Sequence, residues 1–231
     1  SEQMEKRRGK IAMACAPTLA SRKLGETLDS FRRGQPETVI RLLEAAPRAA
    51  LDLLERQRVE FYLGPELPGH SDIAFEPLFE DPIYACIPPA FDDGMERITL
   101  KQIAPHPVIM LDEKTALRSL MDAVLEEEGI ALNLRCELQS AHSSLSLASA
   151  GMGIAILPSI ALAMGPVSKV RTVPIDHHQA RRKIGLITAR GYEQHSYTKQ
   201  LIALIRAEYK GAPPTFEHQQ QGPKVRALTN G

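Results

Sequence analysis

The amino-acid sequence predicts an α/β protein made of two βαβ halves. Short apolar runs of strand length alternate with segments whose apolar residues recur at helical spacing. This alternation occurs once before and once after a long extended segment at 73–88. Glycine and proline end several of the runs, as they do at the boundaries of regular elements. Strands that alternate with helices favour a parallel sheet with helices on both faces.

The first half is expected to follow the order βαβαβ. Its strands are predicted at 11–16, 38–43 and 59–63. Leu24, Leu28 and Phe31 recur at helical spacing and mark the first helix. The second helix starts after Pro47, a residue that suits the first turn of a helix. The extended stretch that follows is predicted at 73–79 and 83–88.

The second half repeats the pattern and adds a terminal helix. Its strands are predicted at 107–111, 132–138, 154–157, 170–175 and 184–189. Apolar residues from Leu117 to Leu125 mark a helix that Gly129 ends. Two further helices begin near Ser140 and Ser159, and the last helix covers the apolar positions between Tyr197 and Ile205.

The charge balance provides no electrostatic surface for nucleic acid. The 231 residues include 28 basic and 28 acidic side chains, so the formal net charge is zero. DNA binding depends on neutralising phosphates with an excess of positive charge. No apolar run approaches the roughly 20 residues of a membrane span, and no apolar segment follows the charged start as in a secretory signal. We therefore expect a soluble, cytoplasmic domain.

The cysteines and histidines predict no metal or cofactor site. Cys15, Cys86 and Cys136 lie far apart in apolar, strand-like runs, which is typical of small buried residues in a reducing compartment. They lack the spacing of metal ligands. His177 and His178 are adjacent, but neighbouring side chains of a strand point to opposite faces.

Sequence motifs for catalysis are absent as well. The chain has no G-x-S-x-G nucleophile motif and no phosphate-binding G-x-x-x-x-G-K-[ST]. The glycines of Gly151-Met152-Gly153 lead into a strand, whereas a dinucleotide-binding loop opens a helix. Residues 126–128 are three glutamates at a helix C-terminus, which we interpret as a solvated face rather than as paired catalytic carboxylates. The chain is not expected to be an enzyme.

The most informative stretch covers residues 140–158. Ser140 and Ser143 suit the N-cap of a helix, and the free N–H groups of a helix N-terminus bind anions. These serines either cap the helix and do nothing else, or they also contribute to an anion site. Gly151 and Gly153 then end the helix and allow a close backbone approach before an apolar strand.

Three segments together resemble the effector-binding domain of LysR-type transcriptional regulators. Residues 147–158 resemble the pattern V-x-x-G-x-G-I-a-x-L-P that occurs late in that domain. Residues 9–14 resemble its first strand after the linker helix, and residues 31–36 resemble the end of its first helix. No single motif is specific, so the resemblance depends on their order and spacing over residues 5–210.

The resemblance implies two Rossmann-like subdomains joined by two crossover strands, a fold of the type II periplasmic-binding-protein class. The strands would cross near Asp81-Pro82 and near Ala189-Arg190. The helix-turn-helix head of such regulators is absent from this sequence. The expected parts are the end of a linker helix at 1–8, subdomain I at 9–80 plus 190–210, subdomain II at 81–189, and a C-terminal extension at 211–231.

Ligands of such sheets bind outside the carboxyl ends of the strands, near helix N-termini. This rule and the resemblance predict an effector site formed by Pro17, Thr18, Ala46, Thr115, Arg118, Ser140, His142 and Ser143. Thr18 and Ser140 best match the polar effector-binding positions of the family. Ala45-Ala46 replace a polar pair found in many relatives, so that side of the site should be apolar. Each residue also has a purely structural interpretation, such as a cap for Thr18 or a solvated helix face for Arg118.

We therefore expect the effector-sensing domain of a LysR-type DNA-binding regulator. The resemblance implies a small molecule bound between the subdomains, and helix N-termini beside Arg118 favour an organic anion. The expected partners are further copies of the chain, as a homodimer or tetramer, and DNA through an N-terminal domain that this sequence does not contain. The alternative is a solute-binding protein of a transport system.

Overall fold

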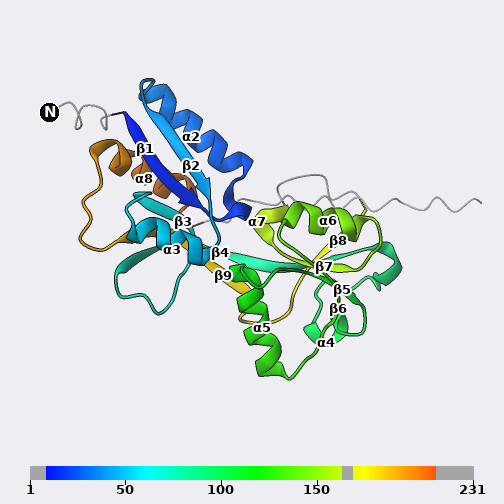
Figure 1. The fold of residues 1–231 in the computed structure, drawn as a ribbon. Helices are drawn as coiled ribbons and strands as arrows, with labels where there is room; N and C mark the ends of the chain where they lie inside the picture. The colour runs from blue at the N-terminus through cyan, green and yellow to red at the C-terminus, as the bar shows by residue number, and fades with distance from the viewer. Residues whose placement is uncertain (1–8, 163–168, 212–231) are drawn as a thin grey trace, which may run out of the picture.

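The computed structural model describes residues 9–162 and 169–211, which form a mixed α/β fold with two lobes (Figure 1). One nine-stranded sheet passes through both lobes. The predicted α/β class with two βαβ halves is confirmed. The expected linker end at 1–8 and the expected extension beyond Gly211 lie outside the described residues.

The first lobe is built on three parallel strands. β1 (Lys10–Cys15) pairs on one side with β2 (Val39–Glu44) and on the other with β3 (Phe61–Pro65). The helices of this lobe are η1 (Pro17–Leu19), α2 (Arg22–Gly34), α3 (Pro47–Glu55) and the C-terminal α8 (Ser196–Tyr209), which packs against α2. Leu24 and Phe31 of the predicted apolar stripe on α2 are buried. Pro47 occupies the first turn of α3, as predicted.

The second lobe repeats this arrangement. β5 (Pro107–Leu111) pairs in parallel with β6 (Asn133–Leu138) and β7 (Ile154–Pro158). Its helices are η2 (Pro89–Phe91), α4 (Leu100–Ile103), α5 (Ala116–Glu128), α6 (Ala141–Ser149) and α7 (Ser159–Leu162). Gly129 ends α5 in the left-handed conformation, with φ of 63°, which confirms the predicted stop.

Two long antiparallel strands connect the lobes. β4 (Ile73–Ile87) pairs with β9 (Arg181–Ala189), and β4 also pairs antiparallel with β7 and with β8 (Arg171–Pro174). β9 pairs antiparallel with β3, which gives the order β2-β1-β3-β9-β4-β7-β5-β6. The sheet is therefore mixed rather than parallel throughout, because the two connections run between the lobes in opposite directions.

Two hydrophobic cores show where the lobes divide. The first core takes Phe79 from β4 and Ile184 from β9, and the second takes Ile83 from β4 and Ala180, which precedes β9. The change of core falls at Asp81 in β4 and at Arg182 in β9, and these two residues are register partners. In β9 the change comes before the expected crossing near Ala189-Arg190, because the first lobe uses most of this strand to cover β3.

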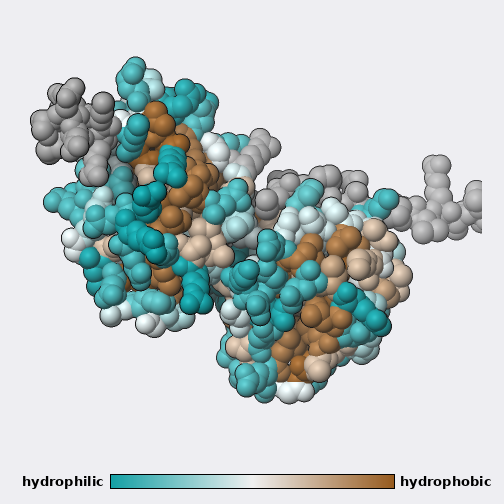
Figure 2. Space-filling model, in the orientation of Figure 1, coloured by the Kyte–Doolittle hydropathy of each residue, from teal (hydrophilic) through white to brown (hydrophobic). Residues whose placement is uncertain are grey.

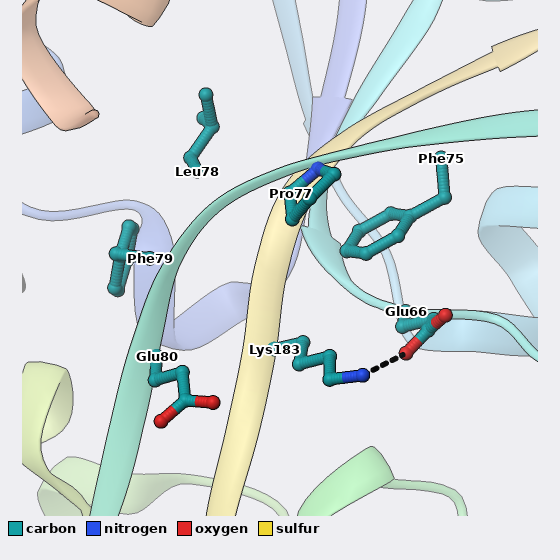
Figure 3. Close-up of a pocket in the computed structure, with 7 residues that line it drawn as sticks. All are labelled: Glu66, Phe75, Pro77, Leu78, Phe79, Glu80 and Lys183. Atoms are coloured by element: carbon teal, nitrogen blue, oxygen red, sulfur yellow. Dashed lines mark ion pairs between the residues drawn. The ribbon is translucent and has the colours of Figure 1, made fainter. Parts of the chain in front are cut away.

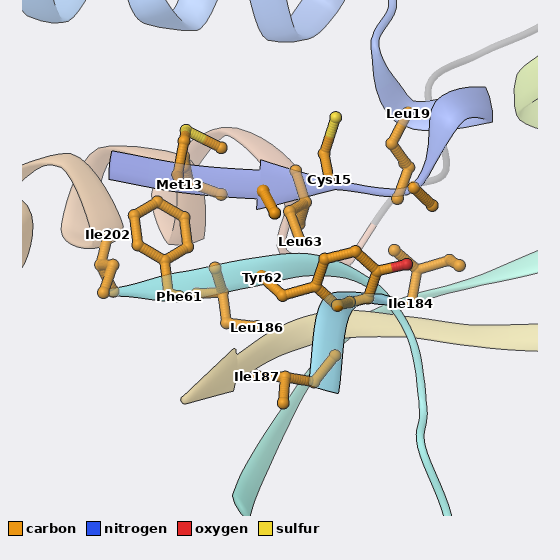
Figure 4. Packing of buried hydrophobic residues seen from close by; sticks show 14 of the residues in the cluster. Met13, Cys15, Leu19, Phe61, Tyr62, Leu63, Ile184, Leu186, Ile187 and Ile202 are labelled. Atoms are coloured by element: carbon orange, nitrogen blue, oxygen red, sulfur yellow. The ribbon is translucent and has the colours of Figure 1, made fainter. Parts of the chain in front are cut away.

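Side chains from the parallel strands and from β9 interlock in the first core (Figure 4). The backbones approach closely at two glycines. A Cβ on Gly185 of β9 would lie 2.1 Å from the carbonyl oxygen of Glu76, and a Cβ on Gly153 would lie 2.6 Å from that of Pro107. Gly153 therefore allows the backbones of β7 and β5 to approach closely, as its motif predicts.

Candidate functional site

The predicted effector residues of the first lobe lie side by side where β1 and β2 end. The Ala16 amide donates to the Leu63 carbonyl at 2.9 Å, and the Ala45 amide donates to the Cys15 carbonyl at 2.9 Å. These bonds hold the segment with Pro17 and Thr18 and the segment with Ala46 at the same edge of the sheet. Thr18 is buried, Ala46 is half-buried and Pro17 is exposed. The structure thus brings a buried hydroxyl and small apolar side chains to the same edge of the sheet.

The predicted residues of the second lobe lie where β5 and β6 end. The Asp112 amide donates to the Leu138 carbonyl at 2.9 Å, which joins the two strand ends. Thr115 accepts from the Arg118 amide at 3.2 Å and caps α5, and Ser140 accepts from the Ser143 amide at 3.3 Å and caps α6. Capping is therefore one role of both hydroxyls. His142 and Ser143 are exposed.

Arg118 is partly covered and already paired with two carboxylates. Its Nη1 donates to Glu137, its Nε donates to Asp122 at 2.8 Å, and its side chain is 19% exposed. The hydrogen bonds that Arg118 donates to Glu137 and then to Asp122 raise the pKa of its guanidinium further above the ordinary range. The cation predicted to attract the ligand is therefore neutralised by its own lobe.

A second polar group lies where the two cores meet, and sequence reasoning missed three of its four side chains. We call it the junction network: Thr18, Asp81, Ser159 and Arg182. The Asp81 carboxylate accepts from Arg182, from the Ser159 hydroxyl at 2.7 Å and from the Ile160 amide at 3.2 Å. Arg182 also donates to the Thr18 hydroxyl at 3.4 Å. All four side chains are buried.

Two signals in the sequence pointed toward the junction network. Asp81 precedes the proline that interrupts the extended stretch, and Ser159 directly follows the motif that ends at Pro158. No local signal marks Arg182, which is one of three consecutive basic residues at 181–183. Only the pairing of β4 with β9 shows that Arg182 faces a buried carboxylate.

A shallow pocket of about 310 Å³ lies on the crossing strands and is separate from the predicted site (Figure 3). Its lining residues are Glu66, Phe75, Pro77, Leu78, Phe79, Glu80 and Lys183. The Lys183 ammonium pairs with the Glu66 carboxylate at 4.0 Å, and Glu80 pairs with Arg181 at 3.2 Å, so each charged side chain that lines the pocket has a partner of opposite charge. None of the eight predicted effector residues lines it.

The two buried thiols, Cys15 and Cys86, and the possible metal ligands provide no further site in the part of the chain that the structure describes. Burial raises the pKa of the Cys15 and Cys86 thiols to about 12, so both are protonated at neutral pH. Residues 9–162 and 169–211 contain no group of three His, Cys, Asp or Glu side chains that could hold a metal ion. No helix in these ranges has the length and apolar character of a membrane span.

Two α/β lobes, joined by two crossing strands with polar side chains at their junction, define a two-lobed ligand-binding domain. Residues 5–210 match the LysR substrate binding domain, and the chain belongs to this family. The predicted resemblance and the predicted fold of the type II periplasmic-binding-protein class are both confirmed. The chain is an effector-binding domain of the LysR type.

The similar curated proteins are transcriptional regulators. The chain is 23% identical over 199 residues to the uncharacterized HTH-type regulator YbhD of Escherichia coli, covering 86% of this chain and 63% of that protein. It is 23% identical over 194 residues to the dual regulator GltC of Bacillus subtilis, covering 83% and 65%. The chain thus spans less than two thirds of the length of these relatives.

Similar solved structures include effector-binding domains with bound small molecules. The effector-binding domain of QuiR in complex with shikimate has a TM-score of 0.76 at 18% identity, covering 87% of this chain and 97% of that one. The regulatory domain of CcmR from Synechocystis, in complex with 2-PG, has a TM-score of 0.80 at 18% identity, covering 89% and 100%. The BenM domain with benzoate has a TM-score of 0.75 at 18% identity, covering 90% and 96%.

Proposed function

We propose that this chain senses a small organic anion between its two lobes, as the regulatory part of a DNA-binding transcription regulator. The family match, combined with a buried hydroxyl at the junction of the lobes, is the observation that carries this proposal. Figure 2 shows the two lobes as separate masses that meet at a waist. Thr18 accepts a hydrogen bond from Arg182, which lies where the two cores divide. The regulator relatives favour this function over that of a transport solute-binding protein.

The hydrogen bonding of the Thr18 hydroxyl favours a ligand that accepts hydrogen bonds. The Thr18 oxygen already accepts from Arg182, and its own hydrogen goes to no acceptor among the described residues. A hydroxyl in this state is ready to donate, and carboxylates are the strongest common acceptors. Shikimate and benzoate, which the QuiR and BenM domains bind, are both carboxylates on a carbon ring.

The shape of the site supports an effector with an apolar portion. Ala45 is buried and Ala46 is half-buried at the sheet edge that also carries Thr18, and Pro47 follows them at the start of α3. Binding pockets combine an apolar lining with a few polar groups that fix the orientation of the ligand. The helix N-termini after Thr115 and Ser140 would add partial positive charge from the second lobe.

We propose further that the chain is cytoplasmic, is not an enzyme, and reaches DNA through a domain outside this sequence. A second copy of the chain is its expected protein partner. Val39 on edge strand β2 is 58% exposed, and Leu134 on the opposite edge strand β6 is 42% exposed. Exposed apolar side chains at both sheet edges suit an interface between copies. Light scattering that gives a monomer mass at high micromolar concentration would contradict this part.

A thermal-shift screen tests the proposed function. The probes are benzoate, shikimate and other small carboxylates, each paired with its uncharged amide. A ligand that binds only the folded chain raises the melting temperature in proportion to RT ln(1 + [L]/Kd). At least one carboxylate should raise the melting temperature and its amide should not. A response to amides or to organic cations alone would contradict the proposed ligand class.

A further inference from the structure

The helix α7 belongs to both lobes. It follows β7 of the second lobe, and Ala161 and Leu162 are part of the second hydrophobic core. Ile160, the residue before them, is part of the first core, and α7 contacts η1 of the first lobe. A change in the angle between the lobes must therefore move Ile160 relative to one of the two cores.

Asp81 holds the start of α7 against the crossing strands. Its carboxylate is fully buried and accepts from the Ser159 hydroxyl and the Ile160 amide at the beginning of this helix. The same carboxylate pairs with Arg182 of the other crossing strand. A buried carboxylate needs these donors, since burying an unpaired charge is strongly unfavourable. The position of α7 is thus tied to the Asp81–Arg182 pair.

Arg182 connects this pair to the effector side of the first lobe. Its Nη2 contacts both the Asp81 carboxylate and the Thr18 hydroxyl. Its Nε is buried and has no hydrogen-bond partner among the described residues. A buried donor without a partner is rare and unfavourable. The guanidinium is therefore held in place by Asp81. Its Nε–H can still donate a hydrogen bond to a further partner beside Thr18.

We propose that the junction network is a latch that sets the angle between the two lobes, with Arg182 as the residue through which a ligand at Thr18 acts on it. This inference rests on the proposed function for the identity of the ligand, but not for the latch itself. An anion beside Thr18 supplies the missing partner of Arg182 and stabilises the latched arrangement. Without the Asp81 charge or the Ser159 hydroxyl, α7 loses its fixed position and the lobes sample more than one angle.

Distances between spin labels on the two lobes test the latch without any ligand. The labels are placed at Glu55→Cys on α3 and Glu127→Cys on α5, both exposed positions, in a Cys136→Ser background. Cys15 and Cys86 are buried and remain unlabelled. The variants are Asp81→Asn and Ser159→Ala. The matched control is Asp92→Asn, because Asp92 pairs with Arg171 inside the second lobe and does not reach the junction.

The unmodified network should give a single narrow distance distribution, and Asp92→Asn should leave it unchanged. Asp81→Asn and Ser159→Ala should each shift or broaden it. Ser159→Ala removes one hydrogen bond to the Asp81 carboxylate and leaves the Asp81–Arg182 pair in place, so it keeps the test valid if Asp81→Asn fails to fold. Folded variants whose distributions superimpose on that of the parent chain would overturn the latch.

Benzoate and shikimate added to the same labelled chains separate the latch from the proposed function. A carboxylate that raises the melting temperature should narrow the distance distribution of the parent chain further, and it should change the distribution of Ser159→Ala less. If the carboxylate binds but does not change the distance distribution of either the parent chain or Ser159→Ala, the latch is wrong while the proposed function stands. If neither probe binds but the ligand-free variants still change the distances, the latch stands and neither of these two carboxylates is the ligand.

Discussion

The guanidinium of Arg118 on α5 is paired with the carboxylate of Glu137 on β6, at the strand ends where the sequence predicts an anion site. A ligand carboxylate there would compete with Glu137 and with Asp122, the second partner of Arg118. The positive charge available to an effector at this position is therefore smaller than the sequence predicts. Thr18, whose hydroxyl hydrogen has no acceptor among residues 9–162 and 169–211, becomes the more important contact.

Arg118→Ala should weaken the binding of an anionic effector by no more than about fivefold, since a paired, partly exposed cation contributes about 1 kcal/mol or less. Glu137→Gln should strengthen binding, because it releases part of the guanidinium charge. Calorimetric titration with the best carboxylate of the screen measures both changes. A loss of a hundredfold or more in Arg118→Ala, about 2.7 kcal/mol, would show that Arg118 is a primary contact after all.

The sequence predicted the fold through patterns that local physical chemistry controls. The glycines at 129 and 153 and the proline at 47 each have the conformational role that their residue types predict. The junction network escaped prediction because it depends on pairing between residues far apart in the chain. Asp81 and Arg182 are separated by 101 positions, and the sequence around either residue does not indicate that the other is its partner. The neutralisation of Arg118 by Glu137 escaped for the same reason.

Glu76 on β4 and Arg206 on α8 should contribute to the acid sensitivity of the fold. The hydrogen bond from Arg206 lowers the pKa of the Glu76 carboxyl below its ordinary value. A carboxyl whose pKa is lower in the folded than in the unfolded chain contributes stability at neutral pH, and that contribution is lost as the pH falls below about 4.3 toward the folded pKa. Glu76→Gln should therefore lose less stability than the parent chain between neutral pH and about pH 3.

Urea unfolding at a series of pH values measures this difference. Arg206→Gln should also reduce the loss of stability between neutral pH and about pH 3. The double variant should show the same pH dependence as either single variant, because both substitutions remove the same interaction. Strictly additive effects would contradict the assignment of the acid dependence to this pair.

The buried thiols should be unreactive in the folded chain. Because burial raises the pKa of Cys15 and Cys86 to about 12, almost no thiolate is present at neutral pH. Iodoacetamide or hydrogen peroxide should modify the half-buried Cys136 first, and Cys15 and Cys86 only after unfolding. Peptide mass mapping of the treated protein measures the order. Rapid modification of Cys15 in the native protein would contradict the packing of the first core.

Gly185→Ala should be strongly destabilising, and Gly25→Ala is its matched control. A methyl group at residue 185 would lie 2.1 Å from the Glu76 carbonyl, so β9 and β4 would have to separate, at a cost of about 3 kcal/mol or more. Residue 25 has open space on α2, where alanine should stabilise the helix by about 0.5–1 kcal/mol. Urea unfolding measures both. Equal effects at the two sites would contradict the close approach of the crossing strands.

Calorimetric titration of Thr18→Val with the best carboxylate of the screen tests the central claim most directly, since the claim is that an anion binds at the junction of the lobes. Thr27→Val is the matched control, because the Thr27 hydroxyl donates within α2 to the Lys23 carbonyl. Thr18→Val should weaken binding about ten- to a hundredfold, the loss expected for a hydrogen bond to a charged group, and Thr27→Val should leave the affinity unchanged. A Thr18→Val chain that is folded and binds the carboxylate as tightly as the parent would contradict the account.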